Sequence, residues 1–275
     1  MKLLQATMGF LGLALMISTN VIAGEIHRAA WEGNLARVKL LLKNNPKLIN
    51  QKDAEGDTPL IEALTPYFTL SNDNEKKKKE AWPKKLEVAK FLIENGADVN
   101  ASAPAHEGKT ALHLAAQWGE KEIAELLISK GAKVDAMMTR GGEETTPLGL
   151  CLPDHTLYQF NSPDEEQNRR KREELEQKNN RRFLVARLLI ENGANVHATK
   201  GSESLLDVCL SQNDTRFADL LLNSGAVKTK QGVTEQGVTE QEVIDAYTTN
   251  SPTLQLLCSH GGKKYHDGWY CRNVP

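Results

Sequence analysis

The chain has almost no excess of charge of either sign. Its 34 Lys and Arg residues are balanced by 36 Asp and Glu residues, which leaves a formal net charge of -2 at pH 7. A protein that binds nucleic acid needs a basic face to replace the counterions of the phosphates. The composition therefore argues against a nucleic-acid partner. With 40% hydrophobic residues, the chain is an ordinary globular one, large enough for one long array or two compact domains.

The sequence also lacks the short motifs that carry chemistry. It contains no nucleophile motif, no phosphate-binding loop and no metalloprotease helix. Its seven His residues are not spaced as metal ligands are. Acidic pairs such as Glu143 and Glu144 lie in an expected loop, where solvated carboxylates are the ordinary interpretation. We therefore expect no catalysis, no cofactor and no metal site.

Long apolar runs are absent as well, and a membrane-spanning helix needs about 20 apolar residues. The apolar stretch over residues 8–17 follows a basic start at Lys2 and precedes Val21-Ile22-Ala23. This order predicts a secretory signal peptide over residues 1–23, cleaved after Ala23. The mature protein is then expected in a periplasm or outside the cell. The alternative is an uncleaved membrane anchor, against which the shortness of the stretch argues.

What the sequence does have is a helix-pair pattern in five to six copies. The clearest copy covers residues 108–132, with a small pair at 115–116, an apolar triplet at 126–128 and a helix-stopping Gly131. The small pair recurs at 29–30, 63–64, 151–152 and 209–210, and the triplet with its Gly recurs at 91–96, 188–193 and 220–225. Such a unit cannot bury its apolar face alone, so the copies must stack into a solenoid.

The termini of the expected helices carry their own signals. Gly after a helix takes the left-handed cap conformation without steric cost, which suits the Gly after each triplet. In the second copy, Thr58 is expected to cap the first helix and Pro59 to occupy its first turn. Small residues in the first helix allow it to pack closely on its neighbour. The pattern therefore predicts antiparallel helix pairs with defined ends.

These residues resemble the ankyrin repeat, over residues 25–261. The resemblance implies an all-α solenoid of about six helix pairs, in which the loops between pairs project as fingers. The repeat domain is expected over residues 24–262, with a capping repeat near its end and a C-terminal tail over 263–275. In that family, partners usually dock on the fingers and on the first helices. The resemblance thus implies noncatalytic protein binding.

Two copies carry insertions between their helices, at about residues 65–84 and 155–180. In the second insertion, Ser162 to Glu165 is a capping-box start. Charged helix formers follow, and a helix continuing to Glu191 would have about 28 residues and span about 42 Å. The first insertion, with Lys76–Lys79 and Trp82-Pro83, predicts a loop leading into a lengthened second helix. Solvated charged surface is one interpretation of both insertions, and a two-pronged partner contact is the other.

The candidate binding residues follow from the same alignment. Trp31 and Trp118 end first helices just before Gly33 and Gly119, in slots that face the concave side of ankyrin-like stacks. An exposed Trp is a common binding anchor, and the alternative is that each Trp packs across its neighbouring repeat. The whole expected docking surface comprises Trp31, Glu32, Ala54, Glu55, Asp57, His106, Glu107, Lys109, Gln117 and Trp118.

Export would permit disulfides among the four Cys residues. Cys151 and Cys209 occupy the same position in adjacent repeats, where equivalent atoms lie about 10 Å apart, whereas a disulfide needs Cα atoms within about 7 Å. We expect these two to be buried free thiols. Cys258 and Cys271 are the predicted disulfide, which would staple the tail. A zinc site with two nearby His residues is the alternative at that place.

The preferred functional hypothesis is a periplasmic protein that binds and neutralises one specific partner. Immunity against a toxin or secreted enzyme fits the signal pattern, the single-domain build and the lack of catalytic motifs. The free protein is expected to be a monomer that does not insert into membranes. One alternative is a secreted ankyrin effector that acts on host proteins. Another is a periplasmic stress-protection or chaperone-like partner.

Overall fold

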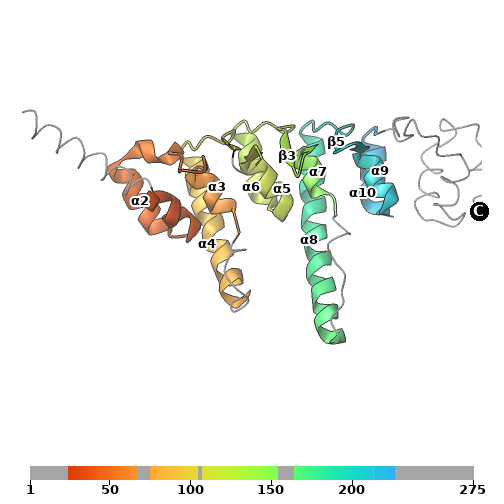
Figure 1. Cartoon of the computed structure of the whole chain (residues 1–275), viewed down its shortest axis with the longest axis horizontal. Coiled ribbons are helices and arrows are strands. Elements are labelled where there is room, and N and C mark those ends of the chain that lie inside the picture. The colour runs from red at the N-terminus through yellow and green to blue at the C-terminus, as the bar shows by residue number, and fades with distance from the viewer. Residues whose placement is uncertain (1–23, 67–74, 105–106, 154–163, 213, 227–275) are drawn as a thin grey trace, which may run out of the picture. The chain divides into compact units, whose positions relative to one another are not determined.

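The computed structural model describes residues 24–66, 75–104, 107–153, 164–212 and 214–226 (Figure 1). Contacts divide the chain into two compact units. The first comprises the residues up to 115 together with 122–133, and the second comprises 116–121 and the residues from 134 on. The predicted signal peptide, the capping repeat, the tail and His106 lie outside the described residues.

The first unit is built of helix pairs and one short hairpin. It contains a helix over residues 24–31, α2 (Leu35–Asn44), the 3-10 helix η1 (Pro46–Asn50), α3 (Pro59–Leu64), α4 (Glu75–Glu94), β1 (Ser102–Ala103), β2 (Lys109–Thr110) and most of α5 (Ala111–Trp118) and α6 (Lys121–Ser129). Strands β1 and β2 pair antiparallel, with Ser102 opposite Thr110. Helix α4 has 20 residues and reaches well beyond its partner α3 (Figure 1).

The second unit repeats this plan. It contains β3 (Met138–Arg140), β4 (Glu143–Thr145), α7 (Pro147–Cys151), α8 (Glu165–Glu191), β5 (Thr199–Lys200), β6 (Glu203–Ser204), α9 (Leu205–Ser211) and α10 (Thr215–Asn223). The strands form two antiparallel hairpins. Helix α8 has 27 residues, about 40 Å at the usual rise, and extends far past α7 (Figure 1). Among the described helices, none is both long and apolar enough to cross a membrane.

The core confirms the repeat register. The positions of the small pair are buried in each of the five copies that the structure describes: Ala29, Ala30, Ala63, Leu64, Ala115, Ala116, Cys151, Leu152, Cys209 and Leu210. The central residue of each triplet is buried too, namely Leu92, Leu127, Leu189 and Leu221. Each helix pair therefore buries a stripe of small and aliphatic side chains, as a stacked repeat must.

The helix caps agree with the sequence in one place and differ in another. Thr58 caps α3 as predicted, because its Oγ1 accepts a hydrogen bond from the amide of Ile61 at 3.4 Å, and Pro59 follows as the first helical residue. Helix α8 begins at Glu165, later than the predicted capping-box start at Ser162, which itself lies outside the described residues. Asp164 caps this helix, since its Oδ1 accepts from the amides of residues 166 and 167 at 3.0 and 3.2 Å. A carboxylate at a helix N-terminus also interacts favourably with the helix dipole.

Both lengthened helices run very close to a glycine of the preceding repeat. A Cβ added to Gly119, whose φ is +72°, would lie 2.6 Å from Cβ of Arg181 and 2.9 Å from the backbone nitrogen of Arg182. A Cβ on Gly33, with φ +69°, would lie 3.0 Å from Cβ of Lys84 and from the backbone nitrogen of Lys85. These glycines therefore do more than end a helix, because they leave the space that the next long helix occupies.

We predict that Gly119→Ala costs more stability than Gly193→Ala. Both residues have positive φ, +72° and +86°, but nothing lies within 4 Å of a Cβ at Gly193. The left-handed backbone alone costs about 1–2 kcal/mol for a residue with a side chain, and the overlap with α8 should add about 1–3 kcal/mol. Urea unfolding followed by circular dichroism measures the free energy of unfolding of each variant. Equal losses in the two variants would show that α8 does not approach Gly119 so closely.

Candidate protein-binding surface

The finger residues of the first unit lie at the surface. Ala54 and Glu55 are exposed, and the Glu55 amide donates to Oδ1 of Asp53 at 2.9 Å, which folds the finger into a tight turn. Glu107 is also exposed, and its φ of +62° marks the turn between β1 and β2. Lys109, in β2, is half-buried. The structure thus presents two finger carboxylates, Glu55 and Glu107, directly to solvent.

Asp57 does not share this exposure. Only 4% of its surface is exposed, and its amide donates to Oδ1 of Asp53 at 2.9 Å. Its carbonyl accepts from Nε2 of His27 at 3.1 Å, and the same nitrogen lies 2.9 Å from the carbonyl of Gln51. His27 therefore ties the first repeat to the next finger. Asp57 belongs to this packed turn, so little of its side chain remains for a partner.

Trp31 lies against the lengthened helix of the second repeat. Its ring is half-buried, and Nζ of Lys85 stands 5.5 Å from the ring centroid. Lys85 itself has an exposed fraction of 0% and donates to the carbonyl of Thr65, the residue that ends α3. The neighbouring Glu32 is exposed and pairs with Arg28 at 3.9 Å. Of the two predicted binding residues Trp31 and Glu32, Glu32 is the one that faces solvent.

Trp118 repeats the arrangement in the second unit. Its half-buried ring has Nζ of Lys178 at 4.5 Å from the centroid, within the range of a cation–π contact. The preceding residue, Gln117, is half-buried, and its carbonyl accepts from Nε of Arg182 at 2.8 Å. The structure therefore supports the second interpretation of these tryptophans, in which each packs across the neighbouring repeat.

Sequence reasoning missed the two buried cations that hold the long helices. Lys85 and Arg182 occupy equivalent positions, each three residues before a buried valine, Val88 or Val185. Each donates to a carbonyl at the end of a first helix, where the helix dipole favours positive charge. The signal in the sequence was a basic residue three positions before Val88 and before Val185, which hold the same place in the repeat pattern.

Lys85 lies close to Glu62, which belongs to a cluster of three acidic groups. One oxygen each from Asp53, Asp57 and Glu62 lies within 4.8 Å of the others, which is the geometry of a possible cation site. Burial, and then the charges of Asp57 and Asp53, raise the pKa of Glu62. Burial also lowers the pKa of Lys85 to about 8, although the charge of Glu62 opposes the change. The ammonium group of Lys85 thus already supplies positive charge to this cluster.

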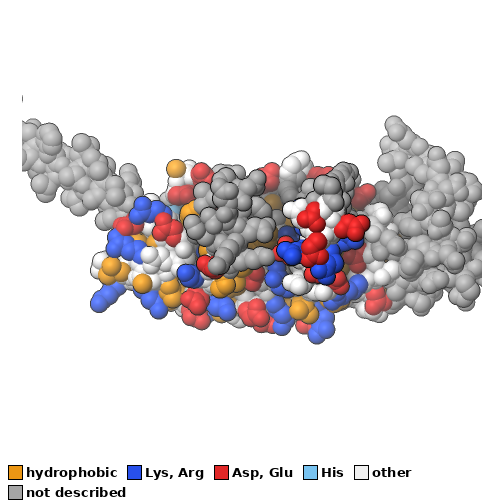
Figure 2. Space-filling model, turned by 90° about the horizontal axis from the view of Figure 1, so that it is seen from below, with side chains coloured by type: hydrophobic (Ala, Val, Ile, Leu, Met, Phe, Trp, Pro, Cys, Tyr) orange, Lys and Arg blue, Asp and Glu red, His pale blue; other side chains and the backbone are white. Residues whose placement is uncertain are grey.

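The projecting part of α8 has a polar surface whose charges pair along the helix. Arg169 contacts Glu166 at 2.7 Å and Glu173 at 3.4 Å, and Arg170 contacts Glu166 at 2.8 Å. The hydrogen bonds from Arg169 and then Arg170 lower the pKa of Glu166. Exposed pairs of this kind contribute little to stability, because water and salt screen them. Figure 2 shows basic and acidic side chains intermingled over the described residues of one face.

The two described cysteines are buried free thiols, as predicted. Burial raises the pKa of Cys151 to about 12, and it also raises the pKa of Cys209. Sγ of Cys151 lies 4.0 Å from the carbonyl of Ala116, so the thiol packs on the preceding repeat. Cys258 and Cys271 lie outside the described residues, and their disulfide stays a prediction.

Alkylation should separate the two kinds of cysteine. In the folded, oxidised protein we expect iodoacetamide to label neither Cys151 nor Cys209, because only the thiolate reacts and burial suppresses it. Unfolding without reductant should expose these two thiols, and reduction should raise the total to all four cysteines of the chain. Mass spectrometry counts the labels. Four labels on the unfolded, unreduced protein would rule out the disulfide. Labelling of Cys151 or Cys209 in the folded protein would contradict their burial.

The burial of Lys85 predicts a pH dependence of stability. Its folded-state pKa of about 8 lies below the ordinary 10.5. Between these values the unfolded chain binds more protons, so the lysine contribution to the free energy of unfolding rises with pH. Relative to Lys85→Met, the wild type should gain at most about 3 kcal/mol between pH 8 and 10.5. Urea unfolding at several pH values measures this gain, and parallel curves for the two proteins would contradict it.

Comparisons with known proteins match the repeat segment. A family model described as ankyrin repeats (3 copies) matches residues 81–139, and one described as ankyrin repeat matches residues 55–103. Human inversin is 31% identical over 159 residues, which cover 55% of this chain and 13% of inversin. A homologue of transient receptor potential cation channel subfamily A member 1 from Caenorhabditis elegans is 30% identical over 147 residues, 47% of this chain and 12% of that protein.

The human NAD-capped RNA hydrolase NUDT12 is 32% identical over 127 residues, 45% of this chain and 23% of that enzyme. The chain therefore spans less than a quarter of each of these relatives, and nothing of their whole-protein activity follows for it. The shared part is the repeat segment, and ankyrin repeats form protein–protein interaction modules. Residues 55–139 are thus a run of ankyrin repeats within an all-α ankyrin repeat fold.

Proposed function

We propose that this protein is exported and that its mature part binds and neutralises one specific protein in the periplasm, as an immunity-type inhibitor of a toxin or enzyme. The ankyrin repeats support a protein partner. The signal-peptide pattern over residues 1–23 supports export. The absence of catalytic motifs in the sequence supports action by binding alone.

The observation that carries the proposal is the firm anchoring of α8. Its root packs on Gly119, and the buried Arg182 bonds to the carbonyl of Gln117. A helix held in this way projects as a rigid element, since its charged surface is already ordered by pairs such as Arg170–Glu166. A preorganised surface loses little conformational entropy when it binds. Such a projection suits tight recognition of one partner better than loose contact with many.

The proposal assigns two surfaces to the partner. In the first unit these are the exposed finger carboxylates, Glu55 and Glu107. In the second unit it is the projecting part of α8, where Arg169, Arg170 and Lys171 are exposed. Trp31 and Trp118 serve indirectly, because they hold the lengthened helices in place.

We predict that the tagged mature protein captures one stoichiometric partner from the native envelope fraction. The triple variant Arg169→Gln, Arg170→Gln, Lys171→Gln, or the double variant Glu55→Gln, Glu107→Gln, should reduce capture at least tenfold, because interface energy concentrates in a few contacts. Glutamine keeps the helix propensity of the replaced residues in α8. Quantitative mass spectrometry of the captured proteins measures the loss.

Arg187→Gln is the matched control, because Arg187 is an exposed arginine near the other end of the same helix. The captured partner is then assayed for its own activity with and without this protein. Many weak partners that respond equally to all variants would contradict a dedicated inhibitor and favour the chaperone-like role. Recovery of the protein from the culture medium instead of the periplasm would favour the effector role.

A further inference from the structure

Helix α4 contains a proline near the point where it passes the end of the preceding repeat. Pro83 lies inside the helix and is exposed. Proline has no amide hydrogen, and in a helix its ring clashes with the carbonyl four residues earlier, so it bends or weakens the helix there. The turn of α4 between residues 79 and 83 therefore lacks one backbone hydrogen bond that an uninterrupted helix would have.

The residues that follow Pro83 are fixed to the body of the first unit. A Cβ on Gly33 would lie 3.0 Å from Cβ of Lys84 and from the backbone nitrogen of Lys85, so the helix passes in close contact with this glycine. Lys85 is buried, and its ammonium group donates to the carbonyl of Thr65. The next buried residues of α4 are Val88, Ala89, Leu92 and Ile93. Residues 84–94 are therefore held by the core and by a buried hydrogen bond.

The residues that precede Pro83 are less buried. We call residues 75–82 the α4 arm. Its side chains are described from residue 80 on, where Glu80 is exposed and Ala81 and Trp82 are half-buried. None of these three belongs to the buried core. The α4 arm and the anchored part of the helix thus meet at the residue that weakens the helix.

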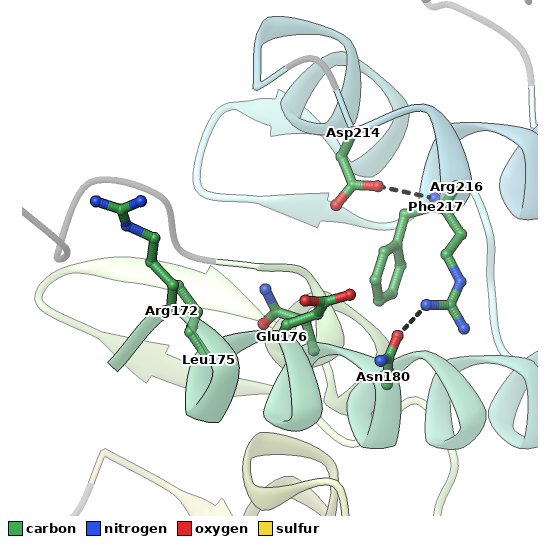
Figure 3. Close-up of a pocket in the computed structure, with 8 residues that line it drawn as sticks. Arg172, Leu175, Glu176, Asn180, Asp214, Arg216 and Phe217 are labelled. Carbon is green, nitrogen blue, oxygen red and sulfur yellow. Dashed lines mark hydrogen bonds between the residues drawn. The ribbon is translucent and has the colours of Figure 1, made fainter. Parts of the chain in front are cut away.

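Helix α8 is uninterrupted at the equivalent place. Since Lys85 and Arg182 hold the same position in their repeats, Pro83 corresponds to Asn180. Asn180 keeps its amide hydrogen, and its Oδ1 accepts a hydrogen bond from Arg216 of α10 (Figure 3). The whole of α8 contains no proline and no glycine. This position therefore ties α8 to a neighbouring helix, whereas in α4 it interrupts the backbone hydrogen bonds.

We propose that the α4 arm pivots at Pro83 on an anchored base, whereas the α8 projection is rigid. Hinges in proteins are a few residues that absorb a change of backbone direction beside a packed element, which is the place of Pro83. The α4 arm can then adjust its direction to what it meets, at a cost in conformational entropy that the preformed α8 surface avoids. The two insertions thus supply one adaptable and one preformed projection.

Distances between two nitroxide labels on one helix, measured by double electron–electron resonance, test the hinge without any partner. In α4 the labels are attached at Glu80→Cys and Glu94→Cys, one on each side of Pro83. In α8 they are attached at the equivalent positions, Gln177→Cys and Glu191→Cys. All four residues are exposed. Each pair is 14 positions apart, about 21 Å along an unbroken helix.

The labelled protein is the mature chain with Cys258→Ser and Cys271→Ser, so that neither of these thiols takes up a label. Cys151 and Cys209 are buried in the folded protein and remain in place.

We expect the distance distribution in α4 to be about twice as broad as that in α8, because a helix weakened by proline samples several bend angles. Pro83→Asn should narrow it to the width found in α8, and Asn180→Pro should broaden the distribution in α8. The Pro83→Asn variant decides the question even if Asn180→Pro does not fold.

Two results would overturn the hinge. A distribution in α4 as narrow as that in α8, even at a shorter distance, would mean that Pro83 makes a fixed bend. A distribution that stays equally broad in Pro83→Asn would mean that the α4 arm frays for reasons unrelated to the proline. Neither result bears on the proposed inhibitor role, which the capture experiment tests separately.

Discussion

The close passage of a long helix over a glycine is the constraint on which each unit depends. In the second unit, the backbone of α8 at Arg181 and Arg182 fills the space that a Cβ of Gly119 would need. In the first unit, α4 stands in the same relation to Gly33. In the second unit this approach brings Arg182 to the carbonyl of Gln117, and in each unit it brings the long helix beside the tryptophan that precedes the glycine. Without it, the projecting parts of α4 and α8 would be held less firmly at their bases.

The two anchors differ in their electrostatics. Arg182 stays charged at any relevant pH, because guanidinium hardly ever deprotonates in a protein. Burial lowers the pKa of Lys85, and the nearby charge of Glu62 offsets this only in part, so the lysine charge costs free energy in the folded state. The same position in two repeats thus carries a permanent cation in one and a titratable cation in the other. The anchor of α4 responds to pH, and the anchor of α8 does not.

The repeat pattern allowed much of the fold to be predicted. The small pairs, the aliphatic triplets and the Thr58 cap all follow short-range rules, and they lie where those rules place them. The lengthened helix α8 was predictable too, since charged helix formers without Gly or Pro continue into an apolar triplet. The cap at Asp164 was missed, because Ser162 and Asp164 both suit a helix N-terminus and local sequence does not choose between them.

The binding surface was harder to predict, because exposure is a property of the neighbours and not of the residue. Asp57 shares its finger with Glu55, yet Asp57 is buried while Glu55 is exposed. The pocket between α8 and α10 left no trace in the sequence, since Leu175 and Phe217 both line it although they are 42 positions apart.

The sequence by itself determined the repeat architecture, the burial of Cys151 and Cys209, the helical extension in the second insertion and the lengthened second helix that follows the first. These follow from periodicity and helix propensity, which act over a few residues. Only the tertiary structure decided that the tryptophans pack against long helices and that Lys85 and Arg182 are buried. The physical reason is that packing between repeats joins residues far apart in the chain, and no local pattern records which side chains it covers.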